Sequence, residues 1–302
     1  MFIEPSVDIF EVNGAGNSGS IVVSNSTFDT SGGFGEDSDG ADQANFLTVY
    51  GDENTSLITL NNSTLDFSQG SFITVDGNNN DTTLNINRSE LYLSGGSFGE
   101  DSLTATELFS IDGNGNSLTV NVTSPNAIDD SFLAAADDYS EISGNLNTID
   151  VNFLRNGDGD LGLEIYGNDN TLNLNFDKQE LDGTRSSVTF DLIETNSTEI
   201  NIDGKRSEFA IGWADGNHDH PGSFIDGDDT VINIDLENNS IMALDTTLET
   251  GVSLTTTVNI DSDDSVFALE FIVEDGHTLD INLNGVDQNS LFFDGGNETS
   301  YL

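Results

Sequence analysis

A triplet of one apolar, one polar and one apolar residue recurs nine times along the chain, and each time the next residue is Asn or Asp. Because side chains alternate between the two faces of a β-strand, the outer residues of a triplet would face a core and the middle one solvent. Successive triplets start 21 to 34 residues apart, a repeat length typical of solenoid proteins. The triplets are Ile58–Leu60, Leu84–Ile86, Leu118–Val120, Ile149–Val151, Leu172–Leu174, Ile200–Ile202, Ile232–Ile234, Val258–Ile260 and Leu279–Ile281.

Two further strand-like segments accompany the triplets. One precedes the triplet and ends in a turn rich in Gly and Asn, as in Ile73–Gly77, and the other follows it and begins with Ser, as in Ser63–Phe67. Alternating apolar residues bounded by turn residues indicate short strands. We therefore predict an all-β, single-domain parallel β-helix, or β-solenoid, of about ten coils with three short strands per coil, about 50 Å long at roughly 4.8 Å per coil.

The predicted β-helix spans residues 20–293. Residues 1–19 form an N-terminal strand segment available for contact between subunits, and residues 294–302 form a C-terminal tail. A loose β-sandwich is the alternative fold, but it does not explain nine Asx residues in register. We expect these residues to stack at one bend as a ladder of hydrogen-bonded side chains. The expected ladder is Asn61, Asn87, Asn121, Asn152, Asn175, Asp203, Asp235, Asp261 and Asn282.

The composition is strongly acidic, with 55 Asp and Glu against six Lys and Arg and a formal net charge of −49. The chain is nevertheless 35% hydrophobic and holds 19 Phe, which favours a folded core over disorder. Its surface would repel nucleic acid and anionic lipid, and its apolar stretches are too short to insert into a membrane. A surface of this charge suits salt water, so we expect an extracellular or cell-surface protein in a marine or saline setting.

The stacked Asx residues and phrases such as Leu60–Phe67 resemble the right-handed parallel β-helix family, the pectate-lyase-like superfold. The likeness is to passenger domains of bacterial autotransporters and filamentous haemagglutinins and, more distantly, to pectate-lyase-like enzymes and phage tailspikes. It covers about residues 20–293. The resemblance implies a surface-exposed rod with a structural or adhesive role.

Catalysis is not expected. β-Helices similar to polygalacturonase have an Asp pair, a Gly-His turn and a basic Arg-x-Lys element. Gly227–Asp229 and Gly276–His277 lie 49 residues apart, and neither Lys nor Arg occurs after Arg206. A lyase needs a cation to stabilise the developing negative charge. We therefore predict no catalytic residues and no enzymatic activity.

Three residues are candidate metal ligands: Asn156, Asp158 and Asp160. They resemble the start of a calcium loop, because alternating oxygen ligands can converge on one hard cation. The rest of an EF-hand loop is missing, so no cofactor is required and Ca²⁺ is the ion these residues would suit. His218 and His220, near Trp213, offer a transition-metal site or, as we favour, a polar excursion between coils. Residues 131–139 are the only Ala-rich helical candidate.

The ends of a β-helix expose unpaired strand edges, which favour pairing with another chain. We therefore predict an extracellular structural solenoid, a subunit of a cell-surface filament or adhesive matrix that binds copies of itself, by head-to-tail stacking or by strand donation. The alternative is a tailspike-like β-helix that binds or cleaves neutral glycans, favoured by long excursions at 95–106, 125–139 and 212–222. The expected assembly residues are Phe2, Ile3, Val7, Ile9, Phe10, Leu291, Phe292, Phe293, Tyr301 and Leu302.

Overall fold

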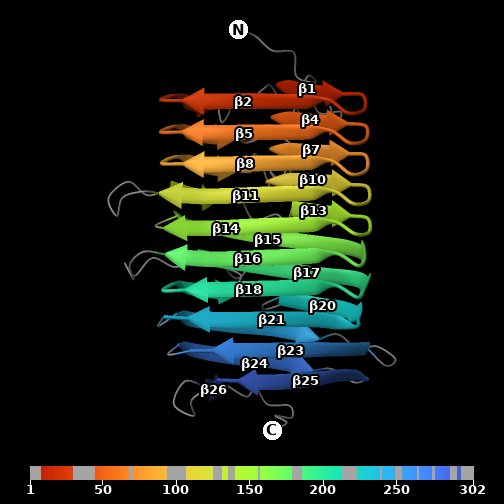
Figure 1. Ribbon diagram of the computed structural model, residues 1–302, viewed down its shortest axis with the longest axis vertical. Coiled ribbons are helices and arrows are strands. Elements are labelled where there is room, and N and C mark those ends of the chain that lie inside the picture. Colours follow the sequence, from red (N-terminus) through yellow and green to blue (C-terminus); the bar gives the residue numbers. More distant parts are fainter. Residues whose placement is uncertain are drawn as a thin grey trace, which may run out of the picture.

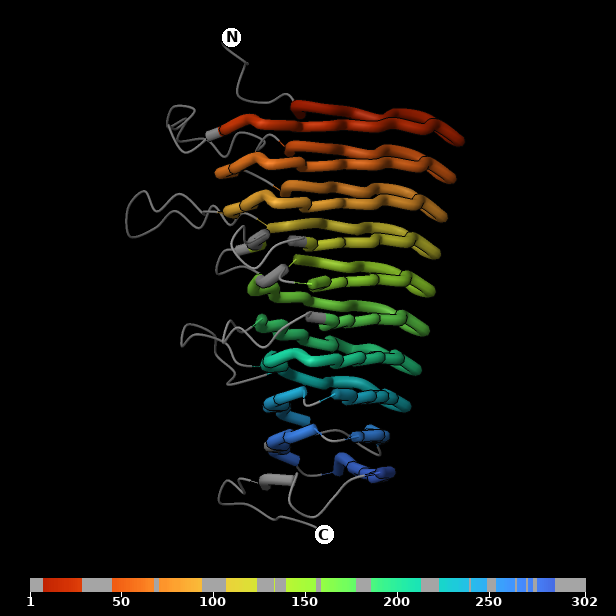
Figure 2. Tube along the Cα trace, turned by 60° about the vertical axis from the view of Figure 1, so that its left-hand side comes forward, coloured from red at the N-terminus to blue at the C-terminus, as the bar shows by residue number. Residues whose placement is uncertain are grey.

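The computed structural model describes most of the chain as β-strands. The described residues are 8–29, 45–67, 71–93, 107–124, 131–134, 140–155, 157–178, 186–212, 223–238, 240–248, 254–263, 265–273, 276–285 and 291–293. Strands in these ranges stack one above another along the long axis of the molecule (Figures 1 and 2). Helix was the candidate structure for residues 131–139, but Ser131–Ala134 forms a strand that pairs with strands on both sides, and residues 135–139 lie outside the description.

Ten parallel strands form the sheet that carries the triplets, and they follow one another in chain order (Figure 1). The strands between the two edges of this sheet bury alternate residues, as the triplet pattern predicted. The strands are β2 (Ser18–Ser24), β5 (Thr55–Asn61), β8 (Asp81–Asn87), β11 (Ser117–Ser124), β14 (Thr148–Arg155), β16 (Thr171–Lys178), β18 (Glu199–Lys205), β21 (Thr230–Glu237), β23 (Leu254–Ser262) and β25 (His277–Asn284).

The segments before and after the triplets form a second, sixteen-stranded parallel sheet. In the first half of the chain these segments are separate strands. Later, β15, β17 and β22 each pair with strands of both series and so join them, and β24 pairs with β22 along its whole length. The strands are β1 (Phe10–Asn13), β3 (Thr27–Asp29), β4 (Leu47–Tyr50), β6 (Thr64–Phe67), β7 (Ile73–Asp76), β9 (Glu90–Leu93), β10 (Phe109–Asp112), β12 (Ser131–Ala134), β13 (Ser140–Ser143), β15 (Gly157–Asn168), β17 (Ser186–Asn196), β19 (Glu208–Ile211), β20 (Ser223–Asp228), β22 (Ile241–Leu248), β24 (Val266–Val273) and β26 (Leu291–Phe293).

The core lies between the two sheets and continues from one strand to the next. Inward residues of equal position stack in columns, as do Phe153 and Phe176, whose rings lie 5.5 Å apart. Phe209 of the second sheet lies beside Gly204, the next residue of that column, and its ring is 4.1 Å from that of Phe176. All three Phe are buried, and each such side chain contributes about 1.5–3 kcal/mol through burial. The predicted fold class, an all-β parallel solenoid, is confirmed.

The turn that leads into the ten-stranded sheet contains a column of stacked glycines. They have φ values from +96° to +146°, which L side chains rarely adopt, and a Cβ on Gly77, Gly113, Gly144 or Gly167 would overlap the carbonyl oxygen of the glycine one coil before. Backbone therefore packs directly on backbone at this corner, which only glycine permits. The glycine column comprises Gly51, Gly77, Gly113, Gly144 and Gly167.

Three residues after each of these glycines stands a buried asparagine. The side-chain Oδ1 of each accepts a hydrogen bond from the backbone N–H of the asparagine one coil before, at 2.9 Å. These side chains are 1–2% exposed, so water cannot replace the bond. We call them the inner Asn ladder: Asn54, Asn80, Asn116, Asn147 and Asn170.

A second, solvent-exposed ladder runs beside the inner one. In this outer Asn ladder, Asn114 Oδ1 accepts the backbone N–H of Asn145 at 2.8 Å, and Asn78 Oδ1 accepts that of Asn114 at 2.9 Å. Its members are Asp52, Asn78, Asn114, Asn145 and Asn168. Sequence reasoning recognised these turns by their Gly and Asn content but did not separate the two ladders.

Candidate functional site: the polar face of the ten-stranded sheet

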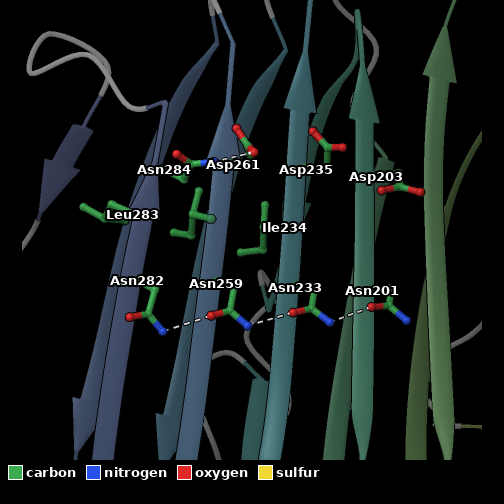
Figure 3. Close-up of a pocket in the computed structure, with 11 residues that line it drawn as sticks. Asn201, Asp203, Asn233, Ile234, Asp235, Asn259, Asp261, Asn282, Leu283 and Asn284 are labelled. Atoms are coloured by element: carbon green, nitrogen blue, oxygen red, sulfur yellow. Dashed lines mark hydrogen bonds between the residues drawn. The ribbon is translucent and has the colours of Figure 1, made fainter.

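Two neighbouring columns of short polar side chains cover the outward face of the ten-stranded sheet. Because paired strands keep a constant register, residues at equal positions stack directly on one another. Figure 3 shows the C-terminal part of this face, with one row of asparagines and a second row dominated by carboxylates. The amide column comprises Asp150, Asn173, Asn201, Asn233, Asn259 and Asn282, and the carboxylate column comprises Asp203, Asp235 and Asp261.

The amide column is held by hydrogen bonds between side chains. Each Nδ2 donates to the Oδ1 one strand before, and Asn201 donates to Asn173 at 2.9 Å. Asn233 donates to Asn201 at 2.9 Å and Asn259 to Asn233 at 2.8 Å (Figure 3). Asn282 continues the series with a bond of 3.0 Å to Asn259. Such a ladder fixes the amide planes and adds to the stability of the stacked strands.

The nine Asx residues expected in one ladder occupy three columns on the strand face, not one column at a bend. Six of them, Asn121, Asn152, Asn175, Asp203, Asp235 and Asp261, share the column that contains the carboxylates. Asn61 and Asn87 pair with each other in the neighbouring column, where the next residue is Thr123. Asn282 stacks on Asn259 in the amide column.

The expected and observed columns differ because some strands have three inward apolar residues, whereas a triplet contains only two. β11 has three inward apolar residues, Leu118, Val120 and Val122, of which the triplet includes the first two. The structure aligns Val120 with Leu84 and Val122 with Ile86, two residues further along the strand. The same shift in β25 places Asn284 rather than Asn282 beside Asp261. Apolar alternation alone leaves such a shift undetermined, because it keeps every apolar side chain facing inward.

An open groove of about 370 Å³ lies between the amide and carboxylate columns, across β18, β21, β23 and β25 (Figure 3). Leu283 lines its C-terminal end and is 42% exposed. Within the described residues, the side-chain carboxylates of Asp203 and Asp235 accept no hydrogen bond, whereas Asp261 Oδ2 accepts one from Asn284 Nδ2 at 2.8 Å. The groove therefore presents free carboxylate oxygens on one side and fixed amides on the other.

Stacking places like charges close together in the carboxylate column. Burial, followed by repulsion from Glu237, raises the pKa of Asp203. Burial, followed by repulsion from Asp203, Glu237 and Asp261, raises the pKa of Asp235. A carboxyl group with a raised pKa binds its proton more tightly in the folded protein than in the unfolded chain. These carboxylates therefore destabilise the fold once they ionise.

Asp235→Asn should stabilise the protein at neutral pH by about 0.5 kcal/mol, the usual size of a cross-strand charge effect. The new amide would replace one of three stacked charges and could donate to Asp203, as Asn284 donates to Asp261. The gain should grow as the pH rises from the ordinary Asp pKa of 3.8 through the raised value of Asp235, and should vanish below that window. Denaturant unfolding followed by circular dichroism at several pH values measures it.

Asp81→Asn is the matched control, because it removes the same charge from the same sheet. Its neighbours in the column are the uncharged Thr55 and Ser117. An equal gain from both substitutions would show that total charge, not the stacked column, sets the effect.

The candidate calcium ligands are only partly described. Asn156 and the side chain of Asp158 lie outside the described residues, while Asp158 and Asp160 are placed in β15, opposite Phe132 and Ala134. Among the described residues, no group of three or more His, Cys, Asp or Glu is arranged to hold a metal ion. Calcium binding stays a prediction. Trp213, His218 and His220 also lie outside the described residues.

The Asp pair and the Gly-His turn have local hydrogen-bond partners. Asp228 Oδ1 accepts the backbone N–H of Asp229 at 2.9 Å and that of Thr255 at 3.1 Å. The buried His277 lies with Nε2 2.8 Å from Thr256 Oγ1. Both residues therefore make bonds that hold turns and strands in place.

Five of the expected assembly residues lie at the two ends of the described chain. Ile9 directly precedes β1, which begins at Phe10, and Leu291, Phe292 and Phe293 form β26, whose backbone pairs with β24. The side chains of β26 and all of Phe2, Ile3, Val7, Tyr301 and Leu302 lie outside the described residues.

In the part of the chain that the structure describes, no helix has the length and apolar character needed to cross a membrane. No family model, no curated protein and no solved structure matches the chain. The stacked parallel sheets show that this protein is an all-β parallel solenoid.

Proposed function

We propose that the protein is an extracellular structural β-solenoid, a subunit of a cell-surface filament or adhesive matrix whose copies join end to end. The observation that carries this proposal is that inward apolar side chains, buried along the rod, become exposed in the first and last strands. Ile260 is 1% exposed, but Leu283, the next residue in its column, is 42% exposed. At the other end Phe10 is 40% exposed, while Leu47 beside it is 1% exposed. A further coil at either end would bury these side chains.

The construction of the rod supports a mechanical role. Backbone hydrogen bonds link every strand of the ten-stranded sheet to its neighbours, and the stacked glycines and both Asn ladders hold the turn. A net charge of −49 keeps the sides of separate rods apart and favours solubility in salt water. These properties support the proposed saline, cell-surface location and the proposed relation to autotransporter and haemagglutinin passenger domains.

Light scattering over a range of concentrations, with electron microscopy of the same samples, tests this proposal. We expect rods one subunit wide whose mean length increases with concentration. A monomer of 32.2 kDa at every concentration would rule out end-to-end assembly.

The groove between the two columns favours a second candidate function, the binding of a neutral glycan. Sugar hydroxyl groups both donate and accept hydrogen bonds, and the groove offers acceptors on Asp203 and Asp235 and amides on Asn201 and Asn259. Its carboxylates would repel an acidic polysaccharide.

Asp235→Ala should weaken binding of a neutral polysaccharide about tenfold or more, since hydrogen bonds to charged groups contribute about 1.5–3 kcal/mol. Calorimetric titration with a panel of neutral glycans measures this effect. Asp81→Ala, on the same sheet but outside the groove, should bind as the parent does. If no neutral glycan binds the parent protein, the groove has no such function.

A further inference from the structure

The two ends of the solenoid present edges of the same two sheets. At the N-terminal edge lie β1, β2 and β3, and at the C-terminal edge lie β25 and β26 (Figure 1). The end of β24, residues 271–273, also belongs to the C-terminal edge, because β26 pairs only with residues 267–269. Because every strand pair is parallel, a second copy placed on the same axis would bring its β2 beside β25 in the direction that the sheet already uses.

We propose that the C-terminal edge of one copy pairs with the N-terminal edge of the next in the register that extends the existing columns. Ile281 then lies opposite Gly19 of the next copy, Asn282 opposite Ser20 and Leu283 opposite Ile21. This register rests on the proposed end-to-end assembly and identifies the surfaces that would form it. It is a head-to-tail contact, which does not close and therefore yields a filament.

The inward residues at the two edges complement one another in size. Within one copy, Gly19 in β2 and Ile281 in β25 are the first and last residues of the same inward column, and the partly buried Ile21 and the exposed Leu283 are the first and last residues of the next. Ile281 of one copy would therefore meet Gly19 of the next, and Leu283 would meet Ile21. In the other sheet, the column of Phe271 leads to Phe10 and that of Val273 leads to Val12. Phe271, Val273 and Val12 are partly buried, so each of these contacts would complete an apolar column.

Charge also favours contact at the ends. β2 contains no charged side chain, whereas β1, β3 and β25 contain one carboxylate each, Glu11, Asp29 and Asp280. By contrast, β18 and β21 in the middle of the same sheet carry Glu199, Asp203, Lys205, Asp235 and Glu237. Two copies of a chain with a net charge of −49 repel one another least where strands with few charges, such as β2 and β25, meet.

Disulfide trapping tests the register, because the chain has no cysteine of its own. Ser20 and Asn282 are exposed outward positions, and the proposed pairing places their Cα atoms about 4.8 Å apart. This lies within the roughly 4.4–6.8 Å that a disulfide spans. The variant Ser20→Cys with Asn282→Cys should give a ladder of covalent oligomers on a non-reducing gel, and reductant should convert the ladder to monomer.

Ser20→Cys with Asn201→Cys is the matched control. Asn201 lies in the same column as Asn282 but three strands before the end, about 19 Å from Ser20 of the next copy. This control and both single variants should stay uncrosslinked. Crosslinked dimers of either single variant would show a head-to-head or tail-to-tail contact and overturn the proposal.

Light scattering of the reduced double variant separates the remaining outcomes, and circular dichroism confirms that it is folded. If the folded variant forms rods that show no disulfide ladder, the register is wrong but end-to-end assembly stands, as expected for donation of an N-terminal strand. If this variant and the parent protein both remain monomeric, both proposals fail.

Discussion

Gly113→Ala should lower the free energy of unfolding by about 4 kcal/mol or more, an exceptional effect for a single methyl group. Gly113 has a φ of +137°, which an L residue avoids, and the added Cβ would overlap the carbonyl oxygen of Gly77. Since the obstacle is backbone on both sides, the coil must separate locally to accept the methyl group. Denaturant and thermal unfolding followed by circular dichroism measure the loss.

Gly16→Ala is the matched control, because it adds the same methyl group at another positive φ, +69°. No atom lies within 4 Å of its added Cβ, so only backbone strain remains, and this costs about 1–3 kcal/mol. Equal losses at the two positions would show that conformation alone, not the close approach of stacked backbones, makes glycine necessary in this turn.

Asn116→Ala should lower the free energy of unfolding by about 3 kcal/mol, because buried polar groups that lose their partners cost about 1–3 kcal/mol each. Asn116 Oδ1 accepts the backbone N–H of Asn80 at 2.9 Å, and its Nδ2 donates to the carbonyl oxygen of Gly77 at 2.9 Å. The side chain is 2% exposed, so water cannot take its place. The same unfolding experiments measure the change.

Asn114→Ala removes a similar side chain two residues earlier in the same turn. Asn114 Oδ1 also accepts a backbone N–H, that of Asn145, at 2.8 Å, but this bond is exposed. Water can satisfy both groups, and the loss should stay below about 1 kcal/mol. A loss from Asn114→Ala as large as that from Asn116→Ala would contradict the assignment of the inner ladder as the stabilising one.

These two turn positions matter for the proposed filament as well as for the stability of one subunit. Each coil contacts only its neighbours, so a weak coil is a point where the rod can bend or open. Gly113 and Asn116 lie in the same turn, and both contact the coil before. Variants at either position should therefore also yield shorter rods in the electron micrographs proposed above.

The strands were predictable from the sequence because the physics that forms them is local. Apolar residues at every second position, such as Ile200 and Ile202, both fully buried, require an extended segment with one face in the core. Their regular spacing required stacked repeats, and the recurring Gly and Asn marked the turns. The functional face was harder to predict. The sequence placed the middle residues of the triplets on the outer face, but it did not indicate that Asn173, Asn201, Asn233 and Asn259 would form the amide ladder, because Thr and Asp also occur at this position.

The sequence by itself determined the class of fold, the order of the strands and the acidic character of the surface, since each depends on residue type and spacing along the chain. Only the tertiary structure decided which residues are neighbours between coils. A shift of two residues in β11 or β25 keeps every apolar side chain inward, so alternation cannot choose between the registers. Contacts between coils make that choice, and they therefore decide that Asn282 continues the amide column while Asn284 bonds to Asp261.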